Sequence, residues 1–140
     1  MSMIQWDTRV CMKVFVYGTL KPGERNHPHY CQGKVQESCM AFTWGQLYEL
    51  SLGYPGMAVG NNKIRGVLLT FKDESILSEL DELEDYSPAR SPQQNQYERR
   101  KIPVYDLNED YLGEAWGYLM TLEKVKKYQG KLIETGWWTE

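Results

Sequence analysis

Glu84 stands where a carboxylate could act as an acid or a base. Apolar residues recur with helical spacing from Asp73 to about Tyr86, and they are Ile76, Leu77, Leu80 and Leu83. At about 100° per residue, Glu84 falls about 50° from the centre of this stripe, so its carboxylate should lie on the border between core and solvent. Apolar surroundings raise the pKa of a carboxyl group, which a general base near neutral pH requires. The alternative is a boundary glutamate paired with an arginine.

The other carboxylates of this segment are expected to face water. They lie roughly 90–150° from the centre of the apolar stripe, and they are Glu79, Asp81, Glu82 and Asp85. Asp73 precedes the stripe and is expected to cap the helix N-terminus. The pattern predicts one main amphipathic helix with Glu84 near its end.

The turn of residues 17–20, with the sequence Tyr17-Gly18-Thr19-Leu20, is the second feature that could take part in chemistry. It follows an apolar, strand-like run, and successive backbone N–H groups in such a turn can bind a carboxylate or a developing oxyanion. Gly18 would let a ligand approach closely. The alternative is an ordinary strand end, in which glycine is needed only for its dihedral angles.

Three further polar side chains, Tyr97, Arg99 and Tyr118, fall in segments with strand-forming patterns. Structure is the default role for such residues, because aromatic side chains favour strands and alternate positions face core and solvent. The Tyr118 hydroxyl could orient a substrate. Arg99 could hold a neighbouring carboxylate, Glu84 included, or could be an exposed cross-strand charge.

His27 and His29, with Cys31 close behind, resemble metal ligands only superficially. Pro28 between the histidines and the lack of a fourth ligand favour a surface loop over a zinc site. The three cysteines show no C-x-x-C spacing, so neither a zinc ribbon nor a disulfide framework is predicted.

These groups must be positioned by a strand-rich fold. Strands are expected at about 12–17, 40–50, 63–71, 97–107 and 112–121. The turn-prone Asn108-Glu109-Asp110 separates the last two, and Met57-Ala58-Val59 is expected to form a tight hairpin with residues 64–69 around the turn Gly60-Asn61-Asn62. Because most connections look antiparallel and one helix dominates, the α+β class is favoured over α/β.

Composition limits the kinds of partner. The 140 residues suit one domain at 12–140 after a flexible N-terminal extension at 1–11, with Met12 as an alternative start. The net charge is −3, from 16 basic and 19 acidic residues that are interspersed, so neither nucleic acid nor an anionic membrane is indicated. No apolar run approaches the roughly 20 residues of a membrane span, and no signal peptide is evident. We expect a cytoplasmic protein with a small-molecule partner, and the oligomeric state stays open.

A series of short motifs in one order resembles the γ-glutamylcyclotransferase-like family, in the branch of γ-glutamylamine cyclotransferases and their AIG2-like relatives. The resemblance covers about residues 12–138. The matching motifs are Phe15-Val16-Tyr17-Gly18-Thr19-Leu20-Lys21-Pro22-Gly23 with Asn26-His27, then Tyr54-Pro55-Gly56, Leu80-Asp81-x-x-Glu84-x-Tyr86, Tyr97-x-Arg99, Ala115-Trp116-x-Tyr118 and Thr135-Gly136-Trp137.

This resemblance implies a fold and a reaction. The fold is a small mixed β-barrel with one main helix and short peripheral helices, a substrate cavity at the barrel mouth, and no metal or organic cofactor. Active members cleave a γ-glutamyl amide by letting its α-amine attack the γ-carbonyl, which yields 5-oxoproline and a free amine. Glu84 matches the catalytic general base and acid of the family. The substrate-binding positions would be Tyr17, Gly18, Thr19, Leu20 and Tyr118, with Tyr97 and Arg99 as further candidates.

The chain also departs from its apparent relatives. Asp85 stands where many of them carry glycine, and the loop at residues 86–96 is long, which could narrow or gate the site. A module that binds a small metabolite without turning it over remains the alternative, because a fold does not guarantee chemistry. The identity of the leaving amine is left open.

Overall fold

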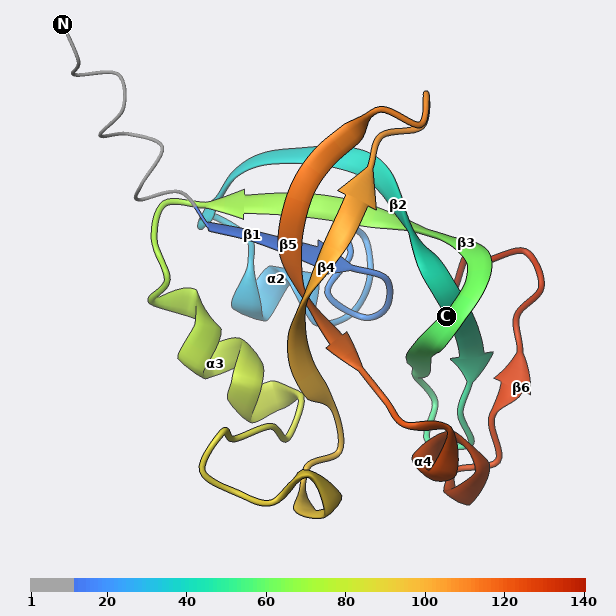
Figure 1. The fold of residues 1–140 in the computed structure, drawn as a ribbon. Coiled ribbons are helices and arrows are strands. Elements are labelled where there is room, and N and C mark those ends of the chain that lie inside the picture. Colours follow the sequence, from blue (N-terminus) through green and yellow to red (C-terminus); the bar gives the residue numbers. More distant parts are fainter. Residues whose placement is uncertain (1–11) are drawn as a thin grey trace, which may run out of the picture.

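Six strands form one sheet that closes on itself in a computed structural model, which describes residues 12–140 (Figure 1). The expected N-terminal extension, residues 1–11, lies outside the described residues. The strand order is β3-β1-β5-β4-β2-β6, and β2 also pairs with β3, which closes the ring. The strands are β1 (Met12–Val16), β2 (Val35–Glu49), β3 (Pro55–Phe71), β4 (Glu98–Tyr105), β5 (Tyr111–Leu119) and β6 (Lys131–Leu132).

Strand β1 lies between β3 and β5, and its residues 14–16 are buried on both faces. Val14 is fully buried and pairs antiparallel with Leu69 of β3 and parallel with Trp116 of β5. A strand covered on both faces reads as a continuous apolar run rather than as an alternating one. The strand therefore ends inside the molecule, and the turn of residues 17–20 follows directly after its buried end.

The long hairpin of β2 and β3 corrects one prediction. Met57-Ala58-Val59 does not fold back on residues 64–69, because both segments belong to β3 and pair with β2. The pairing passes from Gly45 with Asn62 to Gln46 with Ala58, so residues 59–61 bulge out of the ladder instead of forming a turn. Strand β2 also begins at Val35, before the predicted residue 40.

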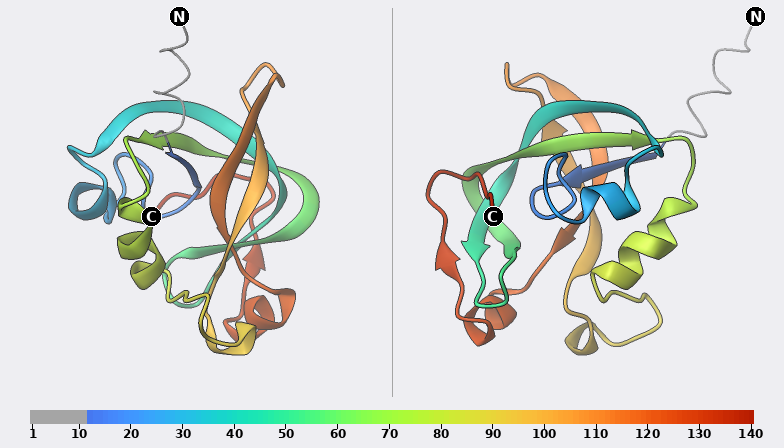
Figure 2. Two further views of the ribbon diagram at one scale, coloured as in Figure 1. Left: turned by 60° about the vertical axis from the view of Figure 1, so that its left-hand side comes forward. Right: turned by 180° about the vertical axis from the view of Figure 1, so that it is seen from behind.

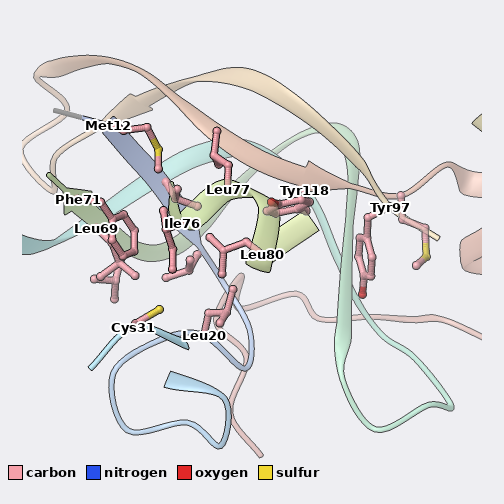
Figure 3. Close-up of a cluster of buried hydrophobic side chains, with 14 of the residues drawn as sticks. Met12, Leu20, Cys31, Leu69, Phe71, Ile76, Leu77, Leu80, Tyr97 and Tyr118 are labelled. Atoms are coloured by element: carbon pink, nitrogen blue, oxygen red, sulfur yellow. The ribbon is translucent and has the colours of Figure 1, made fainter. Parts of the chain in front are cut away.

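Among residues 12–140 the helices are short, and α3 is the longest of them. They are α2 (His27–Tyr30), α3 (Ile76–Leu83), the 3₁₀ turn η1 (Pro92–Gln94) and α4 (Leu122–Lys127). Helix α3 starts later than predicted, with Ser75 at the N-cap position, so the capping role assigned to Asp73 is wrong. The Asp73 carboxylate instead accepts a hydrogen bond from the Ser75 N–H in the preceding turn, at 2.9 Å. Ile76, Leu77 and Leu80 of the apolar stripe are buried as expected, and Figure 3 shows them packed among strand residues, whereas Leu83 is partly buried.

Strands β4 and β5 form a second hairpin, whose tip projects from the body of the molecule (Figures 1 and 2). The turn-prone residues 108–110 lie at this tip, and Glu109 adopts the left-handed φ of 70°. The α+β class, with a closed sheet, one main helix and short peripheral helices, is thus confirmed. No helix within residues 12–140 combines the length and the apolar character that a bilayer crossing demands.

Candidate active site

A pocket opens where the ends of β1 and α3 meet the β2–β3 turn and strands β4 and β5. Its empty volume is about 370 Å³, the open mouth included. Figure 3 shows Leu20, Leu80 and Tyr118 gathered beside α3, with Tyr97 standing to one side of them. The lining residues are Phe15, Val16, Tyr17, Gly18, Thr19, Leu20, Tyr54, Pro55, Glu84, Tyr97 and Tyr118. Every predicted site residue except Arg99 therefore borders this one pocket.

In the turn after β1, the carbonyl groups of Gly18, Thr19 and Leu20 all accept hydrogen bonds. The Gly18 carbonyl accepts from Lys21 N–H at 3.1 Å, and the Thr19 carbonyl accepts from Asn26 N–H at 2.9 Å. The Leu20 carbonyl lies 2.8 Å from His27 Nδ1, which must carry its proton to donate there.

The N–H groups of Gly18, Thr19 and Leu20, by contrast, donate to no other group within residues 12–140. Backbone N–H groups away from water are almost always paired, with protein, water or ligand. This edge of the pocket can therefore donate hydrogen bonds to an anionic group.

The loop after the turn fixes it in this orientation. Asn26 Nδ2 donates to Thr19 Oγ1 at 2.9 Å, in addition to the backbone bond from Asn26 to Thr19. Asn26 and His27 thus hold the carbonyl side of the turn without lining the pocket.

Gly18 is required for packing rather than for its dihedral angles. Its φ lies outside the left-handed range. A Cβ atom at this position would lie 2.8 Å from Cγ of Pro55, closer than real Cβ contacts come. The alternative that glycine is needed here only for its dihedral angles is therefore wrong. Glycine is needed because the Pro55 ring, which also lines the pocket, lies too close to position 18 for a side chain.

Glu84 lies at the C-cap of α3, and its N–H donates to the Leu80 carbonyl at 2.9 Å. The residue as a whole is only partly buried, but its carboxyl group is enclosed where it borders the pocket. Burial, and secondarily the charge of Asp81, raise the pKa of the Glu84 carboxyl to about 8. Its expected position on the border of the core is thus observed, whereas the alternative pairing with an arginine is absent from the ion pairs of residues 12–140.

Three tyrosines share the pocket with this carboxyl group, and each donates its hydroxyl proton to another protein group. Tyr17 donates to the Tyr118 carbonyl at 2.7 Å, Tyr97 to the Pro55 carbonyl at 2.6 Å, and Tyr118 to Asp81 Oδ1 at 2.7 Å. Burial raises the pKa of each of these tyrosines, so all three stay protonated near neutral pH. Toward a ligand, the Tyr97 and Tyr118 oxygens can therefore only accept hydrogen bonds, and the Tyr17 oxygen already accepts one from the Met57 N–H.

Arg99 lies outside the pocket lining and holds Asp81, not Glu84. Arg99 Nε is 2.8 Å from Asp81 Oδ1, and both side chains are 15% exposed. The arginine also lies over the Trp116 ring, 4.4 Å from its centroid. The prediction that Asp81 faces water is wrong, because β4 and β5 cover that side of α3 with Arg99 and Tyr118.

Asp81 is the residue of this neighbourhood that sequence reasoning missed. Its signal was its place three residues before Glu84 in the motif Leu80-Asp81-x-x-Glu84, the spacing at which side chains of a helix are neighbours. Tyr54 and Pro55 also line the pocket, and the sequence placed them only in the family-like motif Tyr54-Pro55-Gly56.

His27, His29 and Cys31 do not converge. His27 binds the Leu20 carbonyl, His29 is exposed, and Cys31 is buried with a raised thiol pKa of about 11. Among residues 12–140, no three His, Cys, Asp or Glu side chains are grouped as a metal site would need.

The pocket thus presents two different chemical surfaces. One is a backbone edge that donates hydrogen bonds, and the other is a carboxyl group of raised pKa among hydroxyl oxygens that accept them. A ligand with a carboxylate at one end and an ammonium nearby, as in an amino acid, matches both surfaces.

Comparison with known proteins identifies a matching family and a similar bacterial protein. Residues 14–140 match the family described as gamma-glutamyl cyclotransferase, AIG2-like. The chain is similar to gamma-L-glutamyl-butirosin B gamma-glutamyl cyclotransferase of Niallia circulans, at 34% identity over 107 residues. That alignment covers 76% of this chain and 65% of the relative, so just under two thirds of the relative's length is spanned.

Solved structures agree in fold. An AIG2-like protein from Mus musculus has a TM-score of 0.67 at 20% identity, over 93% of this chain and 89% of that one. The ytfP protein of Escherichia coli has a TM-score of 0.56 at 28% identity, over 92% of this chain and 97% of that one. With the family match spanning nearly all of the described residues, the chain belongs to the AIG2-like gamma-glutamyl cyclotransferase family.

Proposed function

We propose that this protein is a γ-glutamylcyclotransferase that acts on a γ-glutamyl amine or a related γ-glutamyl amide and releases 5-oxoproline and a free amine. The observation that carries the proposal is that the Glu84 carboxyl, with its pKa raised to about 8, shares one pocket with the free N–H groups of the turn at residues 18–20. The family match and the name of the N. circulans relative support it.

The binding step follows from the two surfaces of the pocket. The N–H groups of Gly18, Thr19 and Leu20 would bind the α-carboxylate of the glutamyl group. The substrate's α-ammonium would then face Glu84 and the hydroxyl oxygens of Tyr97 and Tyr118, which can accept its protons.

The chemical step needs one carboxylate and no enzyme nucleophile. Ionised Glu84 takes a proton from the α-ammonium, and the free amine attacks the γ-carbonyl carbon to close a five-membered ring. When the C–N bond to the leaving amine breaks, protonated Glu84 returns its proton to that nitrogen. The ring nitrogen still carries a second proton to lose, and this proton also passes to the released amine, which leaves as an ammonium, so protons and charge balance over the cycle. Holding the glutamyl chain folded back on itself supplies much of the acceleration, because the ring closure is intramolecular.

The test is to incubate the purified protein with a panel of γ-glutamyl compounds and to assay 5-oxoproline. The panel should include a γ-glutamylated amine of the kind named for the N. circulans relative. We expect product from the wild-type protein, and a loss of at least about 10²-fold in kcat for Glu84→Gln, which keeps the shape but removes the base. Product formed by Glu84→Gln at the wild-type rate would contradict the role of Glu84.

The same panel separates an enzyme from a binding module. A compound that raises the melting temperature of the wild-type protein without yielding 5-oxoproline would identify a binder. For an enzyme, the stabilising compound is also consumed, and Glu84→Gln keeps the thermal shift after it has lost the turnover.

A further inference from the structure

Asp81 has no assigned part in the proposed reaction, yet its carboxylate binds two residues, Arg99 and Tyr118. Its Oδ1 atom accepts from Arg99 Nε at 2.8 Å and from the Tyr118 hydroxyl at 2.7 Å. Arg99 comes from β4 and Tyr118 from β5, so this carboxylate of α3 receives one donor from each strand of the second hairpin. The Asp81 side chain is 15% exposed, so removing either donor would leave a largely buried negative charge without that partner, which destabilises the fold.

We propose that Asp81 is a positioning residue for the acid–base step: held by Arg99, its carboxylate fixes the Tyr118 hydroxyl and keeps a negative charge one helical turn before Glu84. This inference rests on the proposed function for its kinetic consequence. It also makes a claim about Glu84 that can be measured without turnover.

The Tyr118 part follows from the hydrogen bond alone. Since the hydroxyl proton goes to Asp81, the Tyr118 oxygen can only accept from a ligand, which suits an ammonium group and not a carboxylate. If Asp81 were lost, the hydroxyl would be free to turn its proton toward the pocket, where it would oppose an ammonium.

The Glu84 part follows from the charges around it. The groups that share the pocket with Glu84 include no lysine, arginine or histidine. The titratable ones are Tyr17 from the turn after β1, Tyr54 from the β2–β3 turn, Tyr97 preceding β4 and Tyr118 from β5. Among the charged side chains, Asp81 acts on the Glu84 pKa, and Arg99 pairs with Asp81. The negative charge of Asp81 adds to burial in raising the pKa of Glu84.

The two partners of this ion pair should affect Glu84 in opposite directions. Asp81→Asn removes a negative charge and leaves the Arg99 cation unpaired, so the pKa of Glu84 should fall by about one unit. Arg99→Gln leaves Asp81 unneutralised, so the pKa of Glu84 should rise. An ion pair with a purely structural role predicts no such opposition, because both changes would only loosen the fold.

The experiment is to titrate the Glu84 carboxyl by ¹³C NMR in the wild-type, Asp81→Asn and Arg99→Gln proteins, with the Glu84 signal assigned by its absence from Glu84→Gln. Asp85→Asn is the matched control, since Asp85 is adjacent to Glu84 but pairs with Arg90 on the surface. Its titration should match that of the wild type, and Arg99→Lys, which keeps the charge, should lie close to the wild type.

Opposite shifts in the two variants support the proposal, and equal or absent shifts overturn it. If Arg99→Gln does not fold, Asp81→Asn against Asp85→Asn decides the matter alone. In the enzymatic assay, the pH midpoint of the rise in kcat/KM should shift to lower pH in Asp81→Asn, by as many pH units as the Glu84 midpoint shifts in the NMR titration. If no panel compound is turned over, the proposed function fails, while the NMR shifts still test the placement of Asp81.

Discussion

At the scale of single residues, Glu84 is a carboxyl group that the fold keeps partly protonated at neutral pH. A carboxyl whose pKa is higher in the folded state than in the unfolded chain binds more protons when folded. Its contribution to the free energy of unfolding is therefore more favourable at low pH than at high pH. That advantage is lost as the pH rises from about 4.5 toward 8, where the buried group must ionise. Such a cost is expected at a functional site, where local stability is given up for reactivity.

A test of this cost compares the free energies of unfolding of the wild-type and Glu84→Gln proteins across pH. The two should differ little at pH 4, because Glu84 is protonated in both states. At pH 9 the glutamine variant should be more stable by about 2–4 kcal/mol, since it has no carboxyl group to ionise. Urea denaturation at each pH measures the difference, and a constant difference from pH 4 to 9 would show that Glu84 is not buried as described.

At the scale of elements, the sequence predicted what local patterns determine. The continuous apolar run gave β1, and the stripe from Ile76 to Leu83 gave α3 with Glu84 at its border. The sequence could not predict which face of helix α3 the strands of the β4–β5 hairpin cover. Asp81 looked solvent-exposed on the helix alone, and only the β4–β5 hairpin brings Arg99 and Tyr118 to it. The bulge at residues 59–61 was mistaken for a turn because glycine and asparagine favour both.

The loop from the turn to α2 also carries a testable role. Asn26→Ala would remove the bond from Asn26 Nδ2 to Thr19 Oγ1 and loosen the turn that donates to the ligand. One hydrogen bond lost should raise KM for a γ-glutamyl substrate by about threefold to tenfold, with kcat little changed. His29→Ala, on the exposed side of the same segment, should leave both constants unchanged. A fall in kcat at constant KM would place Asn26 in the chemical step instead.

At the scale of the whole molecule, the C-terminal segment closes over the elements that form the pocket. Lys21, directly after the turn, is 1% exposed; its Nζ donates to the Trp138 carbonyl and lies 3.6 Å from the centroid of the Trp137 ring. The Trp138 indole donates to Glu49 Oε1 at 2.6 Å, and the Gly136 carbonyl accepts from Arg65 N–H at 2.8 Å. The last residues thus tie β2 and β3 to the turn.

Gly136 is where this closure is most sensitive to substitution. Its φ is +72°, and an added Cβ would lie 2.1 Å from the Lys63 carbonyl oxygen. Gly136→Ala should therefore lower the free energy of unfolding by about 3 kcal/mol or more, from backbone strain and collision together. Gly23→Ala is the control, because φ is +93° there with no atom near the added Cβ, and it should cost about 1 kcal/mol. Equal costs in chemical denaturation would mean that the C-terminal segment does not pack against β3 as described.

The most direct test of the role of Glu84 is the dependence of kcat/KM for 5-oxoproline formation on pH. Because the ionised carboxylate must accept the proton and its pKa in the free protein is about 8, kcat/KM should rise with pH to a midpoint near 8. The residual rate of Glu84→Gln should lack this rise. A wild-type profile that is flat between pH 6 and 9, or that has its midpoint near the ordinary glutamate pKa of about 4.3, would contradict the account.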